Sequence, residues 1–257
     1  MKVINFTLSG STAFFKKPEV NTYYYFTYGN IHKVALLGMF GAILGYKGYS
    51  EYSKMMIKVK KSKELKYGFP EFYEKLERLK LSIIPNCDKG FISKKVQTFN
   101  NSVGYASKEQ GGNLIIKEQW LENPSWDICF IVDTEEAKKL AEYLINRKCV
   151  YIPYLGKNDH YANITNVMEH EIYLANGELI TIDCLIKKSS VKDYVMDAED
   201  MLELDDFDAF KYEEKLPYSL NSITNNYELE SFIYTNVPMK IIDSQVYKMN
   251  NKNLLFY

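Results

Sequence analysis

The sequence predicts an α+β protein with a core of alternating strands and helices. Two segments carry this prediction most clearly: an apolar opening strand over residues 3–8 and a capped helix over residues 135–146. In chain order the expected elements are strand, helix, strand, hairpin, strand, helix, strand. This order is typical of the βαββαβ core of a ferredoxin-like (RRM-like) sheet.

The first expected helix, over residues 31–46, is apolar and contains several glycines. Asn30 is expected to cap its start. Gly38, Gly41 and Gly45 lower its intrinsic stability, and close packing of the helix backbone against a sheet is the expected reason for them. Three further segments follow: a strand over residues 55–60, a charged helix over residues 71–79 and a strand over residues 81–85.

Residues 86–112 are expected to form a projecting β-hairpin, or thumb. The segment is polar, yet Val96, Phe99 and Val103 recur at strand-like spacing. Two strands follow it, over residues 114–116 and 128–132. The helix over residues 135–146 then begins after Thr134, a good N-cap, with two glutamates in its first turn.

We expect residues 1–188 to form the core domain and residues 189–257 to form an acidic linker with a small β-rich C-terminal extension. Residues 192–215 contain ten acidic residues against three lysines, a composition typical of a solvated surface or a flexible linker. Five further segments have strand-like composition: residues 164–167, 171–174, 179–185, 232–239 and 246–257.

Charge is divided unequally along the chain, although the net charge is only -1. Residues 1–120 hold 19 Lys and Arg against 9 Asp and Glu, and the remaining residues hold 13 against 24. This division favours a basic face for a polyanion and an acidic part elsewhere. The alternative is that the two sets of charges interleave on the folded surface and cancel.

The cysteines and histidines predict no metal site, disulfide framework or cofactor. Cys87, Cys129, Cys149 and Cys184 are widely spaced, which fits a reducing cytoplasm. The N-terminus lacks the apolar core of a signal peptide, and the longest apolar run, over residues 34–44, is too short to span a bilayer. We therefore expect a soluble cytoplasmic protein without a membrane partner.

Three segments together, over residues 6–46, 113–124 and 151–164, resemble the Cas-five family of CRISPR-associated proteins in its type I-B form. An opening strand, a basic-aromatic turn over residues 14–18 and a glycine-containing helix end follow in the family's order. The most family-specific motif is the sequence PYLGK at residues 153–157. The resemblance covers most of the first 165 residues and is weaker afterwards.

The resemblance implies a role in antiviral defence. Members of the family are subunits of the type I surveillance complex, Cascade, and belong to the RAMP class of RNA-binding proteins. They hold the repeat-derived 5′ handle of the guide RNA (crRNA) with a ferredoxin-like core and a thumb hairpin. They also contact the backbone-forming subunit and the large subunit, and meet target DNA through the complex.

Lysine and aromatic residues supply the chemistry that such a role needs. Lysine binds phosphates, while aromatic and amide side chains take unstacked bases. The Lys16-Lys17 pair could instead solvate a turn, whereas Lys94 and Lys95 have no competing core role on a projecting hairpin. The candidate RNA-binding residues are Lys16, Lys17, Tyr25, Tyr28, His32, Lys33, Lys94, Lys95, Gln97, Phe99, Asn100, Asn101, Lys117 and Lys157.

Two other functions remain open at this point. In a metal-independent endoribonuclease that processes precursor CRISPR RNA, His32 would be the general base, with Tyr28 and Lys33 beside it. Cutting relatives would need a Lys-His pair after the thumb, where this chain has Lys117 followed by Glu118, so we expect no catalysis. The second alternative is a ferredoxin-like protein-interaction module without RNA.

Overall fold

The computed structural model describes residues 1–19, 23–53, 68–100, 104, 108, 110, 114–175, 177, 179–194 and 208–257. Three features predicted from the sequence lie outside the described residues. They are the strand over residues 55–60, the predicted contact by Asn101 and the acidic stretch at residues 195–207.

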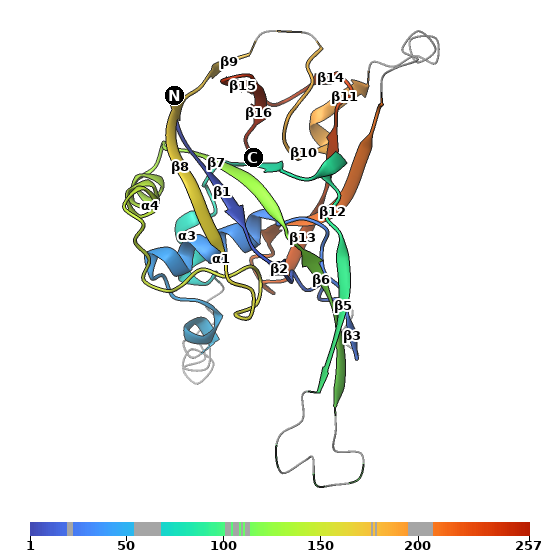
Figure 1. Ribbon diagram of the computed structural model, residues 1–257. Helices are drawn as coiled ribbons and strands as arrows, with labels where there is room; N and C mark the ends of the chain where they lie inside the picture. Colours follow the sequence, from blue (N-terminus) through green and yellow to red (C-terminus); the bar gives the residue numbers. More distant parts are fainter. Residues whose placement is uncertain are drawn as a thin grey trace.

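Four antiparallel strands form the central sheet (Figure 1). Across the sheet their order is β4 (Leu81–Pro85), β7 (Ser125–Ile131), β1 (Lys2–Ser9) and β8 (Asn163–Glu171). Strand β1 lies inside the sheet and is buried along most of its length, which explains its apolar composition. The chain is thus a mixed α+β protein, as predicted.

The helices α1 (Lys33–Leu44), α3 (Glu71–Leu76) and α4 (Glu135–Ile145) lie together on one side of the molecule (Figure 1). Helix α4 confirms the sequence prediction, because Thr134 Oγ1 accepts a hydrogen bond from the Ala137 N–H at 3.1 Å. Among the described residues, no helix is long and apolar enough to cross a membrane.

The start of α1 differs from the prediction. Its N-cap is His32, whose Nδ1 accepts a hydrogen bond from the Ala35 N–H at 3.2 Å. Asn30 instead accepts a hydrogen bond from the indole N–H of buried Trp126 and donates one to the Gly90 carbonyl. The loop before α1 is therefore held by hydrogen bonds to residues that are remote in sequence, and no local sequence pattern indicates such contacts.

The glycines of α1 allow close packing, but the partner is a helix rather than the predicted sheet. A Cβ atom at Gly41 would overlap the Cβ of Phe72 on α3. Gly45 ends the helix with φ 79°, in the left-handed region where glycine costs least. Close approach to Phe72 and the helix C-cap are thus the local reasons for two of the three glycines.

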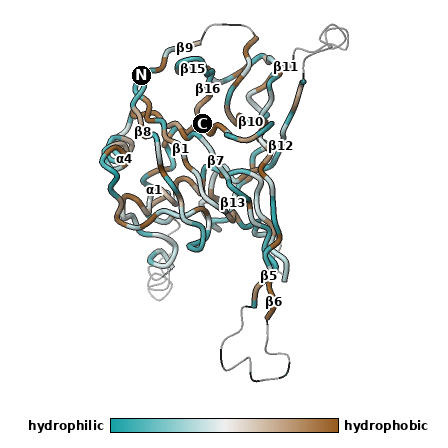
Figure 2. Tube along the Cα trace, viewed as in Figure 1, coloured by the Kyte–Doolittle hydropathy of each residue, from teal (hydrophilic) through white to brown (hydrophobic). Residues whose placement is uncertain are grey.

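Strands β5 (Lys94–Asn100) and β6 (Ile115–Glu122) form a hairpin that projects from the body of the molecule (Figures 1 and 2). Its arms lie further along the chain than the predicted range of 86–112, and the predicted strand over 114–116 belongs to its second arm. The pairing of β6 with β2 (Thr12–Ala13) and β3 (Tyr24–Tyr25) explains the difference. Those contacts are remote in sequence.

In the part of the chain that the structure describes, the remaining strands build three small sheets. Strand β10 pairs with β13 and β9 pairs with β15, so these sheets join strands from both sides of residue 188. Residues 211–215, which were expected to belong to a linker, begin strand β12. The strands are β9 (Tyr173–Leu174), β10 (Ile186–Lys187), β11 (Val191–Tyr194), β12 (Lys211–Leu220), β13 (Tyr227–Thr235), β14 (Met239–Ile241), β15 (Val246–Met249) and β16 (Lys252–Leu255).

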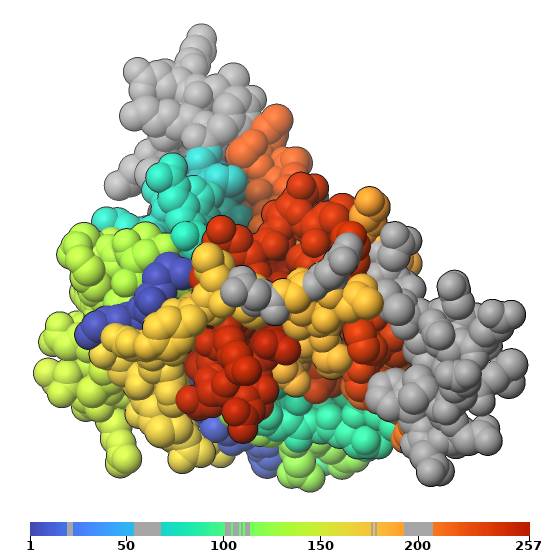
Figure 3. Space-filling view, turned by 90° about the horizontal axis from the view of Figure 1, so that it is seen from above, coloured from blue at the N-terminus to red at the C-terminus, as the bar shows by residue number. Residues whose placement is uncertain are grey.

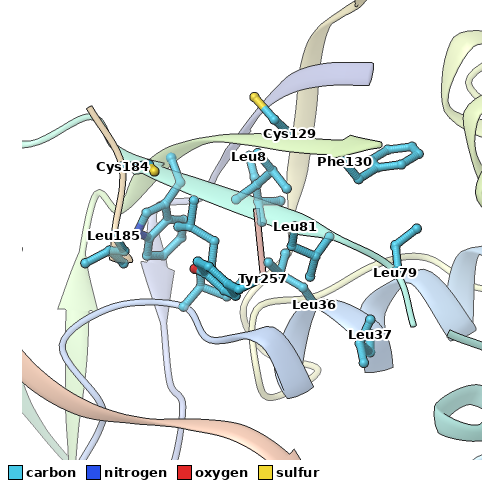
Figure 4. Packing of buried hydrophobic residues seen from close by; sticks show 14 of the residues in the cluster. Leu8, Leu36, Leu37, Leu79, Leu81, Cys129, Phe130, Cys184, Leu185 and Tyr257 are labelled. Atoms are coloured by element: carbon cyan, nitrogen blue, oxygen red, sulfur yellow. The ribbon is translucent and has the colours of Figure 1, made fainter. Parts of the chain in front are cut away.

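The hydrophobic core is continuous between the central sheet and the C-terminal strands. In Figure 4, Leu81 of the sheet lies near Tyr257, and both belong to one buried cluster with Leu8, Phe130 and Leu185. The backbones of residues 81 and 257 also exchange hydrogen bonds. Seen from above, the C-terminal strands in red lie against the yellow and orange segments of residues 160–190 (Figure 3).

Candidate nucleic-acid interface

An open groove of about 1160 Å³ lies at the base of the projecting hairpin and continues along α1. The hairpin side contributes Phe99 and Glu118. The helix side is lined by small residues of α1, among them Gly38 and Ala42. Beyond these small residues the groove reaches Tyr46, Lys47 and Tyr49, so aromatic and charged side chains occur at both of its ends.

The basic turn, residues 14–18, forms one wall of the groove. Its backbone pairs with the following aromatic run, since the Lys17 N–H donates to the Phe26 carbonyl at 2.8 Å. This pairing places the Lys16 Nζ 4.0 Å from the centroid of the Tyr25 ring. An ammonium group in that position is attracted to the ring face and keeps a defined orientation.

A loop over residues 153–161 packs against this turn and lines the groove beside it with Tyr154, Gly156 and Lys157. Gly156 has φ 86°, and a Cβ atom there would overlap the carbonyl of Phe14 in the basic turn. The loop can therefore press against the turn only with glycine at this position. The glycine of the PYLGK motif at residues 153–157 is therefore explained by this close contact with Phe14.

Lys157, the next residue in this loop, points to the hairpin. Its Nζ lies 5.0 Å from the centroid of the Phe99 ring and 3.3 Å from Glu118 Oε1. Glu118 is buried and also accepts a hydrogen bond from the Trp120 indole N–H at 2.8 Å. A fixed carboxylate thus orients the Lys157 ammonium beside an aromatic ring.

The predicted hairpin residues lie on two faces. Lys95, Gln97 and Phe99 share one face with Glu118, because side chains alternate along a strand. Lys94, Asn100 and Lys117 lie on the other face. The structure therefore divides the predicted hairpin residues between the groove and the opposite side.

The opposite face carries a second basic group. Lys17 lies 5.0 Å from the Tyr28 ring centroid and 3.4 Å from Glu214 Oε1. Burial lowers the pKa of Lys94, while Glu214 raises it and Lys17 lowers it. Lys17 and Glu214 form an ion pair whose charges act on Lys94, and Glu214 comes from strand β12, far along the chain.

His32 lies at the floor of the groove but is almost fully buried, and Tyr28 and Lys33 are buried beside it. His32 is 3% exposed, and burial lowers its pKa to about 3. Lys33 packs 5.0 Å from the centroid of the Tyr218 ring, and burial, then Lys187, lowers its pKa to about 8. Burial also raises the pKa of Tyr28. These three side chains therefore lie close together because they pack in the interior.

Salt bridges reduce the unequal division of charge. The ammonium groups of the basic first 120 residues pair with carboxylates from beyond residue 120. The pairs are Lys2–Glu169, Lys17–Glu214, Lys75–Glu136, Lys80–Asp133, Lys89–Asp208 and Lys95–Glu122. At these positions the two sets of charges interleave, which is the alternative that the sequence left open.

Sequence reasoning missed three residues that shape this interface: Glu118, Glu214 and His160. His160 is buried, its Nδ1 lies 2.6 Å from Thr12 Oγ1, and its ring meets Trp120 edge-on at 4.6 Å. It joins the loop, the hairpin and β2. His160 lies in the segment over residues 151–164 that the sequence singled out, but its contact with Thr12, 148 residues away, could not be predicted from the sequence. Within the described residues, no three His, Cys, Asp or Glu side chains cluster as a metal site would require.

Comparison with known proteins places the fold but not the family. No protein-family model and no curated protein matches the sequence. A chain of a CRISPR RNA-guided surveillance complex is similar in structure, with a TM-score of 0.52 and 12% identity over 93% of this chain and 91% of that chain. A CRISPR protein from Archaeoglobus fulgidus aligns over 99% and 98% of the two chains, with a TM-score of 0.47 and 12% identity.

Proposed function

We propose that this protein is a non-catalytic subunit of a type I CRISPR surveillance complex that binds and caps the 5′ handle of the guide RNA. The observation that carries the proposal is the groove between the hairpin, the basic turn and the loop over residues 153–161. There Lys16 and Lys157 are held beside Tyr25 and Phe99. Cations for phosphates next to rings for bases are what an unpaired RNA end requires.

The architecture supports the proposal. The sheet order β4-β7-β1-β8, with α1 after β1 and α4 after β7, agrees with the βαββαβ order proposed for a ferredoxin-like core. The projecting hairpin is inserted between β4 and β7, where a thumb would lie. The likeness to a chain of a CRISPR RNA-guided surveillance complex agrees with a Cas-five protein, and the resemblance in sequence favours the I-B form.

The hairpin face opposite the groove carries exposed apolar side chains beside Lys94 and Lys117, and these support contact with other subunits. Val96 is 54% exposed and Ile115 is 58% exposed on a hairpin that stands away from the body. Exposed apolar side chains at such a place favour burial against a neighbouring protein. We assign this contact to the backbone-forming or large subunit, with target DNA reached through the assembled complex in the cytoplasm.

The nuclease alternative has little support in the geometry. A general base must reach the 2′-hydroxyl of the RNA and accept its proton near neutral pH. His32 is buried, its Nδ1 already caps α1, and burial lowers its pKa to about 3. Tyr28 and Lys33 are buried beside it.

Equilibrium binding with single-stranded RNA of the cognate repeat tests the proposal. The purified protein should bind the handle sequence more tightly than a scrambled RNA of equal length, and leave it uncut. The Lys94→Ala/Lys95→Ala variant should bind the RNA more weakly. The slope of log affinity against log salt concentration should be shallower by about one to two, because a protein with fewer phosphate contacts releases fewer counterions on binding.

The control for this variant is Lys138→Ala/Lys148→Ala, two exposed lysines on and after α4. Equal binding of both RNAs would favour a protein-interaction module. Cleavage at one position, abolished by His32→Ala, would favour the endoribonuclease.

A further inference from the structure

The carboxylate of Glu214 is held more firmly than an ordinary surface carboxylate. The Gly29 N–H lies 2.9 Å from each of its oxygens, and the Tyr212 hydroxyl donates to Oε2 at 2.6 Å. Its side chain is only 14% exposed. Two donors from different parts of the chain thus fix its position.

This carboxylate in turn fixes the Lys17 ammonium group. The Lys17 Nζ lies 3.4 Å from Glu214 Oε1 and 5.0 Å from the Tyr28 ring centroid. Lys17 remains reachable, with 35% of its side chain exposed. A charged donor held between a carboxylate and a ring has lost much of the freedom that a surface lysine keeps.

Gly29 is what allows the carboxylate to come so close. A Cβ atom at this position would lie 2.5 Å from the Tyr212 hydroxyl oxygen and 2.9 Å from Glu214 Oε2. A side chain here would have to displace the Tyr212 hydroxyl and the Glu214 carboxylate from their present positions. Glycine at this position therefore leaves room for the carboxylate.

We propose that Glu214 is a positioning residue for RNA contact on the hairpin face opposite the groove, where strand β12 lies beside the hairpin and the basic turn. The inference rests on the proposed function. Glu214 holds Lys17 where it meets a phosphate together with Lys94, which is close enough for both charges to act on it. RNA affinity would then depend more on the fixed positions of these lysines than on the net positive charge of the surface.

The direction in which RNA affinity changes when the Glu214 carboxylate is removed separates a positioning role from simple electrostatics. Removing a carboxylate next to a phosphate would strengthen RNA binding if only charge mattered, because a repulsive neighbour is lost. If Glu214 positions Lys17, its removal weakens binding instead. A purely structural role for Glu214 would lower the thermal midpoint without changing affinity below the unfolding transition.

The experiment measures RNA binding and Lys17 reactivity in the full-length protein. Glu214→Gln should bind the cognate repeat RNA roughly three- to tenfold more weakly, with a salt slope shallower by up to about one. In a Lys17→Ala background it should cause no further loss. Lys17 should also react faster with an amine reagent, as measured by peptide mass spectrometry without RNA.

Two further variants complete the design. Glu213→Gln is the matched control, because Glu213 is next to Glu214 but pairs with Lys188 at 2.8 Å and Lys211 at 3.2 Å. It should bind RNA as the parent does. Glu214→Asp keeps the negative charge but moves it away from Lys17 by the length of one methylene group. If Glu214→Gln does not fold, Glu214→Asp should show the same weakening of RNA binding.

The possible failures are distinguishable. Equal or tighter RNA binding by Glu214→Gln, or unchanged Lys17 reactivity, would overturn the inference alone. If Glu214→Gln weakened RNA binding by the same factor in the Lys17→Ala background as in the parent, Glu214 would not act through Lys17. A parent protein without affinity for the repeat RNA would overturn the proposed function and this inference together.

Discussion

Aromatic side chains at this interface have different roles according to their depth. Phe99 lies at the groove beside Lys157, whereas Tyr28 lies beneath Lys17 with its hydroxyl buried. The sequence indicated both as candidates, because an aromatic residue serves cores and base stacking alike. Depth depends on contacts with remote segments, so the sequence could not separate the two roles.

Phe99→Leu should weaken RNA binding while leaving its salt dependence unchanged. Leucine keeps an apolar side chain but cannot stack on a base, and stacking contributes about 1–3 kcal/mol per base. Phe91→Leu is the control, since Phe91 is 63% exposed and does not line the groove. The measurement is affinity at several salt concentrations, and equal loss in both variants would exclude a specific role for Phe99.

His32 should make the protein less stable at acidic pH. Its folded pKa is about 3, below the ordinary 6.5, so between these values the unfolded chain binds the extra proton. Stability is therefore lost as pH falls from about 6.5, by about 2 kcal/mol between pH 7 and 5. His32→Asn keeps a capping side chain but does not titrate, and its denaturant midpoint should fall less over this range.

At the scale of elements, local signals predicted α4 well and the hairpin only in part. Helix α4 carries its own cap, acidic first turn and apolar stripe, so nothing remote decides its bounds. The hairpin arms depend on the pairing of β6 with β2 and β3, and of Lys94 with Leu121. The sequence indicated that a hairpin exists, while remote pairing decided where it lies.

The contact between α1 and α3 gives a stability prediction. Gly41→Val should lower the thermal midpoint, because a branched side chain would overlap Phe72, and overpacking costs about 1–3 kcal/mol. Gly48→Val is the matched control, since a Cβ atom there has no neighbour within 4 Å. Equal midpoints for the two variants would show that α3 moves away without cost.

At the scale of the whole molecule, the two ends of the chain build one site. Strand β12 reaches Gly29 through Glu214, across 185 residues, and β10 pairs with β13 across the predicted domain boundary at residue 188. The sequence showed the separation of charge but not its cancellation, because ion pairs such as Lys17–Glu214 exist only after folding. The basic turn and the loop over residues 153–161 were predictable as motifs, whereas their contact was not.

Photo-crosslinking of bound repeat RNA, followed by peptide mass spectrometry, tests most directly that this groove holds the guide RNA. The account predicts crosslinks in peptides that contain Tyr25 and Phe99, which line the groove, and their loss with a scrambled RNA. Tyr173 and Phe91 are well exposed, at 65% and 63%, but do not line it. Crosslinks confined to those two residues, or independent of RNA sequence, would contradict the account.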